Sequence, residues 1–154
     1  HGRIVTILSA GNDSGKSFTV VGTDINGAAQ TESITGANAG TATGAVFFLT
    51  IASITAVGNP AGNVSAGVNA SAADVVFAGR SRLKGVFLTS TATAGTVDFL
   101  KNSPSGTSIL GLSSVGDADA TRDVVIPDEG VLFVDGIYIQ YTVSTFLTMT
   151  VFHA

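Results

Sequence analysis

The sequence predicts an all-β protein, an antiparallel β-sandwich or jelly-roll-like fold made of two small β modules packed together. Short runs of Val, Ile, Thr and Phe alternate with clusters of Gly, Asn, Asp and Pro at intervals of roughly ten residues, as in sandwiches and barrels. Only 12% of the residues are charged, while 45% are hydrophobic. With 19 glycines in 154 residues, a long amphipathic helix would be costly to form.

The segments with alternating or β-branched residues are predicted strands. They are residues 3–8, 17–23, 30–35, 46–57, 63–68, 82–89, 96–101, 108–112, 122–126, 130–133, 136–142 and 147–152. In the last of them, the alternation predicts that Leu147, Met149, Val151 and His153 share one face.

Local signals predict how some of these strands are joined. Residues 24–27, Asp-Ile-Asn-Gly, predict a tight hairpin turn, because Asn and Gly tolerate positive φ angles. Residues 102–106 and 135–136 are turn signals of the same kind. Phe48, Ile51 and Ile54 have a spacing of three, which allows one helical turn before a strand at 53–57.

A module boundary is predicted in the small, polar stretch 67–73, where the strand pattern is weakest, which gives modules 1–72 and 73–154. Of the 11 acidic residues, only Asp13, Asp24 and Glu32 precede this stretch. A module of this size buries only about 60% of its unfolded surface, so it is marginally stable alone. The two modules are therefore expected to share a core or to be stabilised by oligomer contacts.

Composition argues against several classes of protein. The chain has no Cys, so disulfides, thiolate metal ligands and cysteine nucleophiles are excluded. The formal net charge of −4 is not that of a nucleic-acid-binding protein. The longest nearly unbroken apolar stretch, residues 45–52, is far shorter than the roughly 20 residues that cross a bilayer. No basic and apolar signal region opens the sequence, and neither a membrane nor a nucleic acid is expected as a partner.

Residues 10–17, Ala-Gly-Asn-Asp-Ser-Gly-Lys-Ser, have the spacing of a relaxed phosphate-binding loop. That chemistry needs a helix starting at Lys16, whose N-terminus would bind the phosphates. Residues 17–23 instead have the pattern of a strand. The segment is therefore predicted to be an ordinary hairpin loop, and no nucleotide is expected.

The acidic residues of the second half form short clusters at Asp117, Asp119 and Asp123 and at Asp128 and Glu129. Carboxylates bind hard cations, but these spacings lack the order of an EF-hand loop. Solvated turns are the favoured interpretation, and no metal or other cofactor is expected.

Catalytic constellations are sparse, and we predict that the protein is not an enzyme. The two histidines are His1 and His153, and no Gly-x-Ser-x-Gly motif accompanies them. With two Tyr and no Trp, the chain has few side chains for stacking against sugars.

Arg80, Arg82 and Lys84 alternate, so in a strand they would share one face. That face could pair with an acidic patch on a partner subunit, or it could protect an edge strand from aggregation. Together with Tyr138 and Tyr141, these three residues are the candidate partner-interface residues.

The first half resembles a β module that recurs in virion proteins of tailed bacteriophages, and the second half resembles a β module of small phage structural proteins. The segments that carry the first resemblance are residues 3–15, 18–27, 31–41, 51–58 and 61–67. The segments that carry the second are residues 80–86, 126–139 and 148–152.

This resemblance implies a non-enzymatic virion component. The favoured expectation is a capsid decoration, or cement, protein on the outer capsid surface, where it would bridge neighbouring major capsid subunits. It would act as a homo-oligomer, with a trimer favoured. The alternatives are a tail, neck or fibre component that binds other virion subunits, and a carbohydrate-binding receptor module.

Overall fold

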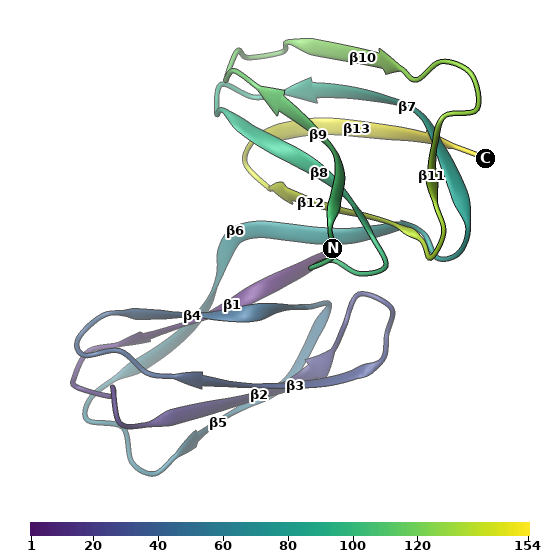
Figure 1. The fold of residues 1–154 in the computed structure, drawn as a ribbon. Coiled ribbons are helices and arrows are strands. Elements are labelled where there is room, and N and C mark those ends of the chain that lie inside the picture. Colours follow the sequence, from purple (N-terminus) through teal and green to yellow (C-terminus); the bar gives the residue numbers. More distant parts are fainter. The chain divides into compact units, whose positions relative to one another are not determined.

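The structure, a computed structural model, describes all residues 1–154, and every regular element in it is a strand (Figure 1). The thirteen strands are β1 (Gly2–Ser9), β2 (Ser17–Thr23), β3 (Ala29–Thr35), β4 (Thr41–Phe48), β5 (Thr50–Val57), β6 (Val64–Phe77), β7 (Ser81–Ser90), β8 (Gly95–Lys101), β9 (Ser108–Ser114), β10 (Thr121–Val125), β11 (Val131–Phe133), β12 (Ile137–Thr142) and β13 (Phe146–His153). The strand registers are antiparallel, and the predicted all-β class is confirmed.

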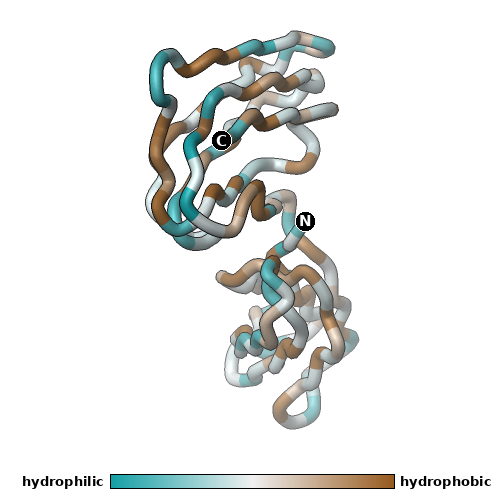
Figure 2. The backbone as a smooth tube through the Cα atoms, turned by 90° about the vertical axis from the view of Figure 1, so that its right-hand side faces the viewer, coloured by the Kyte–Doolittle hydropathy of each residue, from teal (hydrophilic) through white to brown (hydrophobic).

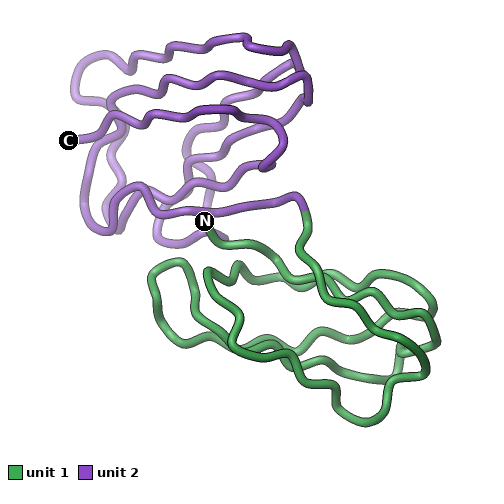
Figure 3. The backbone as a smooth tube through the Cα atoms, turned by 180° about the vertical axis from the view of Figure 1, so that it is seen from behind, with its two compact units in different colours: residues 1–69 green, residues 70–154 purple.

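The chain divides into two compact units, His1–Asn69 (unit 1) and Ala70–Ala154 (unit 2) (Figure 3). The division between the units falls within residues 67–73, where the sequence pattern is weakest, but this stretch is part of the 14-residue strand β6, which the sequence pattern predicted only as far as residue 68. Its small side chains give little strand signal, yet Ala72 and Ala73 are fully buried and pair with β12. Burial and backbone pairing thus make this segment a strand where propensity does not.

Unit 1 consists of two sheets, with strand orders β4-β1-β6 and β3-β2-β5. In the second sheet β2 is central, and Phe18 lies opposite Ile34 on β3 and Ala56 on β5. Apolar side chains of both sheets form one buried cluster. Its members are Val5, Ile7, Phe18, Val20, Ile34 and Phe48.

Unit 2 is also a sandwich of two sheets. One has the order β6-β12-β8-β9; in the other, β7 pairs with β10 and β11 along one edge and with β13 along the opposite edge. Figure 1 shows β7, β10 and β13 as a layer beside the layer that holds β8, β9 and β12. The buried cluster between them contains Leu83, Val86, Leu88, Val97, Phe99, Phe133, Ile137 and Ile139.

Hydrophobic residues are distributed along both units in short stretches rather than in one long run (Figure 2). No helix in the structure could cross a membrane. The alternation of apolar and polar residues therefore serves the two cores, with one face of each sheet turned inward.

The sequence pattern predicted one strand over residues 46–57, or a helical turn before a strand at 53–57. The structure has neither of these. The chain leaves β4 at Phe48 and starts β5 at Thr50 in the other sheet of unit 1. At the step between them, the Leu49 amide donates a 2.8 Å hydrogen bond to the Thr23 carbonyl. The spacing of three reflects this change of sheet, since Phe48 is buried whereas Ile51 is exposed.

The predicted turn at residues 24–27 is confirmed in atomic detail. The Asp24 carboxylate accepts hydrogen bonds from the amides of Asn26 at 2.9 Å and Ala28 at 2.8 Å. Gly27 has a φ of +84°, which a side chain would disfavour. The turn signals at 102–106 and 135–136 likewise join β8 to β9 and β11 to β12.

The predicted face of the last strand is partly wrong. Met149 and Val151 do pack against the unit 2 core, but Leu147 is 58% exposed. A register shift between Phe146 and Thr148 turns Phe146 inward in place of Leu147. A bulge of this kind breaks the two-residue period, so sequence alternation alone could not reveal it.

Candidate interaction surface

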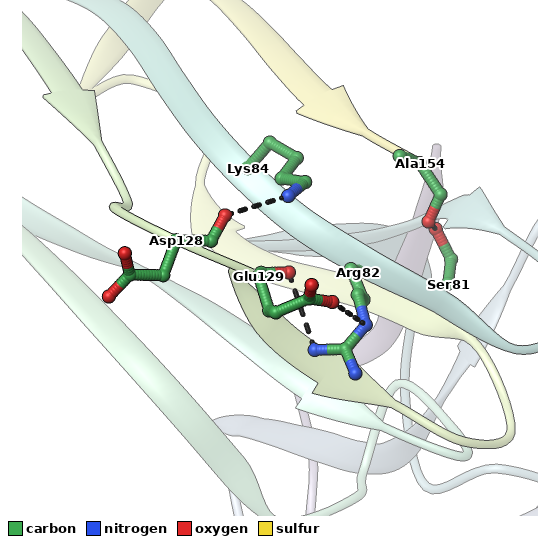
Figure 4. Close-up of polar contacts among 6 residues, drawn as sticks. All are labelled: Ser81, Arg82, Lys84, Asp128, Glu129 and Ala154. Carbon is green, nitrogen blue, oxygen red and sulfur yellow. Dashed lines mark hydrogen bonds and ion pairs between the residues drawn. The ribbon is translucent and has the colours of Figure 1, made fainter.

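The basic residues of β7 contact the turn between β10 and β11 (Figure 4). Arg82 Nη1 donates a 3.3 Å hydrogen bond to the Glu129 carbonyl, and Arg82 Nε lies 3.6 Å from the Glu129 carboxylate. Lys84 Nζ donates a 3.0 Å hydrogen bond to the Asp128 carbonyl. Arg82 and Lys84 therefore attach their own chain's turn to the centre of the sheet.

This arrangement corrects one of the two interpretations of the basic residues. β7 is not an edge strand, because β10 and β11 cover one side of it and β13 covers the other. Arg82 and Lys84 therefore have no edge to protect. Arg80 lies just before β7 and is exposed. Pairing of these cations with an acidic partner subunit stays a prediction.

The two tyrosines differ in how much of each is accessible. Tyr138 is only 6% exposed and lies in β12 between Val75 of β6 and Leu100 of β8. Tyr138 is therefore not a candidate interface residue, since a buried side chain offers a partner almost no surface. Tyr141 is half-buried and lines a groove.

That groove lies in unit 2 and has a volume of about 280 Å³. One wall is formed by β13, and the other by residues of β6 and β12. The lining residues are Asp74, Ile139, Tyr141, Phe146, Leu147, Thr148, Met149 and Val151. Asp74 accepts a 2.9 Å hydrogen bond from the Val75 amide. The groove is thus lined by apolar side chains together with polar groups, among them the Asp74 carboxylate.

β13 forms the edge of its sheet, because β7 is the only strand that pairs with it. None of its eight residues is Asp, Glu, Lys, Arg or Pro, the residues that commonly protect an edge, and its register shifts, which can also protect one, lie only toward its two ends. Leu147 and Phe152 are 58% and 52% exposed. The sequence analysis missed this surface, although the absence of charge over 146–153 was a readable signal.

Unit 1 has a comparable groove of about 270 Å³ beside its edge strand β5. Its lining residues are Ile7, Phe18, Ile54, Ala56, Pro60, Val64 and Ala66. β5 also lacks charged residues, but it ends beside one. Lys16 Nζ lies 3.6 Å from the point that a Cβ of Gly58 would occupy, directly after the strand. This edge is therefore guarded by a cation, whereas β13 has no charged residue along its length.

The segment that resembles a phosphate-binding motif is a loop, and β2 rather than a helix follows it, as predicted. It is not a hairpin loop, because β1 and β2 do not pair and the loop joins one sheet of unit 1 to the other. Its backbone is used internally: the Asp13 amide donates to the Ala37 carbonyl, and the Lys16 amide donates to the Asp13 carbonyl, both at 2.9 Å. Asp13 itself is fully buried, and its Oδ1 accepts a 2.7 Å hydrogen bond from the Ala61 amide. This carboxylate fastens loops of unit 1, a role that the sequence did not reveal.

The other candidate residues do not gather into a chemical site. No group of three or more acidic or histidine side chains is placed to hold a metal ion. His153 Nδ1 lies 3.3 Å from the Ser81 hydroxyl, and the His153 ring stacks obliquely on Phe77 with ring centroids 5.1 Å apart. Ser81 in turn donates to the Ala154 carbonyl at 3.1 Å (Figure 4), so these contacts hold the end of the chain against β7.

Comparison of the chain with protein-family models, with curated proteins and with solved structures finds no match.

Proposed function

We propose that this protein is a structural component that assembles with other protein subunits through its exposed strand edges and does not act as an enzyme. The observation that carries the proposal is the uncharged edge of β13 beside a groove. An edge strand can add main-chain hydrogen bonds to a partner strand, while the adjoining groove accepts apolar side chains. Unit 1 has a second edge and groove at β5, where Lys16 lies beside the end of the strand.

The resemblance to phage virion modules supports a more specific proposal, that the protein is a capsid decoration protein on the outer surface of the shell. It would bridge neighbouring major capsid subunits and act as a homo-oligomer. Several weak contacts made at once give a high overall affinity, because each bound copy raises the effective concentration of the next contact. A tail, neck or fibre position would use the same edges to form a ring or a stalk.

The alternative function, carbohydrate binding, is favoured by one observation, a polar hollow of about 220 Å³ in unit 2. Its lining residues are Ser71, Thr96, Asp98, Gln140, Tyr141 and Thr142. Hydroxyl, amide and carboxylate groups suit a sugar, and Tyr141 is the one aromatic side chain among them. Asp98 already accepts a 2.9 Å hydrogen bond from Ser108.

The decisive experiment adds the purified chain to phage capsids that lack a decoration protein and measures their survival of heat or osmotic shock. Restored resistance, with the added chain seen on the shell by electron microscopy, is the expected result. Binding to the tail alone would replace the capsid position by the tail position. Absence of binding to any part of the particle would refute the virion proposal.

The sugar alternative is tested separately on a glycan array with the wild-type chain and with Gln140→Ala, which removes an amide from the hollow. Binding that this substitution abolishes would favour the receptor module. A blank array would leave the assembly proposal as the better account.

A further inference from the structure

We infer that β13 of one copy pairs in antiparallel register with β13 of a second copy, so that two copies join their β7 sheets across a two-fold axis. The inference rests on the proposed function in one respect, since it takes the edge of β13 as an assembly surface. It goes further by naming the occupant of that edge. It also predicts a dimer, where the sequence analysis favoured a trimer.

The edge is straight enough to pair over its central part. Residues Thr148 to Phe152 lie in unbroken register with Thr89 to Gly85 of β7, and the register shifts occur only at either end of this run. Thr148, Thr150 and Phe152 are exposed. The amide and carbonyl groups on the outer side of this run are therefore available for a second antiparallel ladder.

Charge permits an identical copy as the occupant of this edge. The chain has a net charge of −4, and unit 2 accounts for most of it, with eight acidic and five basic residues. Two copies that approach through most of their surface bring like charges together. β13 has no charged residue, so along this strand two copies meet without that repulsion. A partner recognised by opposite charge would find nothing on β13 to recognise.

The sequence of the strand also suits self-pairing. Thr150 lies at the centre of the regular run, so a two-fold axis there places Thr150 opposite its own copy. Thr148 then lies opposite Phe152 on the outer face, and Met149 lies opposite Val151 on the face that borders the groove. Such pairing covers the exposed Phe152 ring with a neighbouring side chain, and an isologous contact of this kind closes after two copies.

Other edges of the molecule are less suitable. β10 carries Arg122 and Asp123, and β9 has Gly111 in its interior, where a strand gains little from packing. β5 has small side chains and ends beside Lys16. β13 combines an uncharged strand, the exposed apolar side chains of Leu147 and Phe152 and an adjoining groove.

The first test is the mass of the purified chain in solution, measured by sedimentation equilibrium over a range of concentrations. We expect twice the single-chain mass of 15.4 kDa, decreasing to one copy on dilution. Thr150→Lys places two cations opposite each other and should give a single copy throughout the range. The matched control, Thr55→Lys, makes the same change at an exposed threonine of β5, another uncharged edge, and should stay dimeric.

A second test keeps the inference falsifiable should Thr150→Lys fail to fold. Because the chain has no cysteine, Thr150→Cys introduces a single thiol, which should form an intermolecular disulfide under mild oxidation. Thr55→Cys, the matched control, should remain reduced under the same conditions.

Three results would overturn the inference: a single-copy mass for the wild-type chain at every concentration, a trimer, or a dimer whose Thr150→Cys variant forms no more disulfide than Thr55→Cys. A monomeric chain that still protects capsids would refute self-pairing and leave the proposed function standing. A β13-paired dimer that binds no phage particle would refute the virion proposal and leave self-pairing standing.

Discussion

Units 1 and 2 are both two-sheet sandwiches, but they are held together by different means. Unit 2 has a core of eight large apolar residues, and its buried polar side chains are hydroxyls, such as that of Ser90, which donates a 3.0 Å hydrogen bond to the Asp117 carbonyl. Unit 1 has six core residues and adds a fully buried carboxylate, Asp13, that fastens the Ala61 amide. A unit that buries fewer apolar side chains depends more for its stability on specific polar contacts and on close backbone packing.

The two units also differ in how they protect their edges. β5 and β13 are both eight residues long and both uncharged, and each borders a groove. The difference is Lys16 beside the end of β5 and the larger side chains of β13, including Leu147 and Phe152. Similar strands can therefore have different tendencies to pair, depending on what the fold places next to them.

The largest expected effect is the loss of a core ring in unit 2. Phe99 is fully buried, so Phe99→Ala should lower the free energy of unfolding by about 3–5 kcal/mol, through lost burial and the cavity left behind. Both tyrosines lie in unit 2 and the chain has no Trp, so tyrosine fluorescence during urea denaturation follows this unit. Phe99→Leu, which retains most of the volume, should lose less. Equal losses for the two variants would contradict the packing argument.

The next largest loss of stability is expected in unit 1, where the backbones of Gly22 and Thr50 lie very close together. A Cβ at Gly22 of β2 would overlap the carbonyl oxygen of Thr50, so Gly22→Ala should destabilise unit 1 by about 1–3 kcal/mol. Gly15→Ala is the control, because no other group lies within 4 Å of its Cβ position. Amide hydrogen exchange of β2 and β5 measures the change. Comparable protection in both variants would show that β2 and β5 are not so closely apposed.

The buried carboxylate is tested by a pair of substitutions. Asp13→Ala leaves the Ala61 amide without an acceptor and should cost about 1–3 kcal/mol. Asp13→Asn retains a side-chain oxygen at this position and should cost less. Hydrogen exchange at Ala61 distinguishes them: faster exchange is expected for Asp13→Ala, and an unchanged rate would show that the loop is held by other contacts.

The smallest effect is expected at the exposed ion pair of unit 2. Glu129 is 82% exposed in its side chain and Arg82 is 33% exposed, so Glu129→Gln should change the free energy of unfolding by less than about 1 kcal/mol. The hydrogen bond to the Glu129 carbonyl remains in this variant. Urea denaturation at low and at high salt measures the difference, which should be smaller at high salt. A large, salt-independent loss would require a buried role for this carboxylate.

Local patterns were sufficient to predict most strands, because alternation and turn residues act over a few positions. Residues 17–23 and the turn at 24–27 depend on neighbours along the chain, and both were predicted correctly. Residues 67–73 and 46–57 were not predicted correctly. The first segment is a strand because it pairs with β12, and the second is divided because the chain changes sheet within it. Composition indicates neither the pairing partner of a strand nor the residue at which the chain changes sheet.

The candidate surface shows the same division. From the sequence, Arg82, Lys84 and Tyr138 were plausible partner contacts, but only the fold could place the first two against the 128–129 turn and bury the third. The chain itself determined its all-β class and a final strand without charges. Tertiary structure decided that this strand lies at an edge beside a groove, because strand order and bulges arise from pairing between residues far apart in the chain.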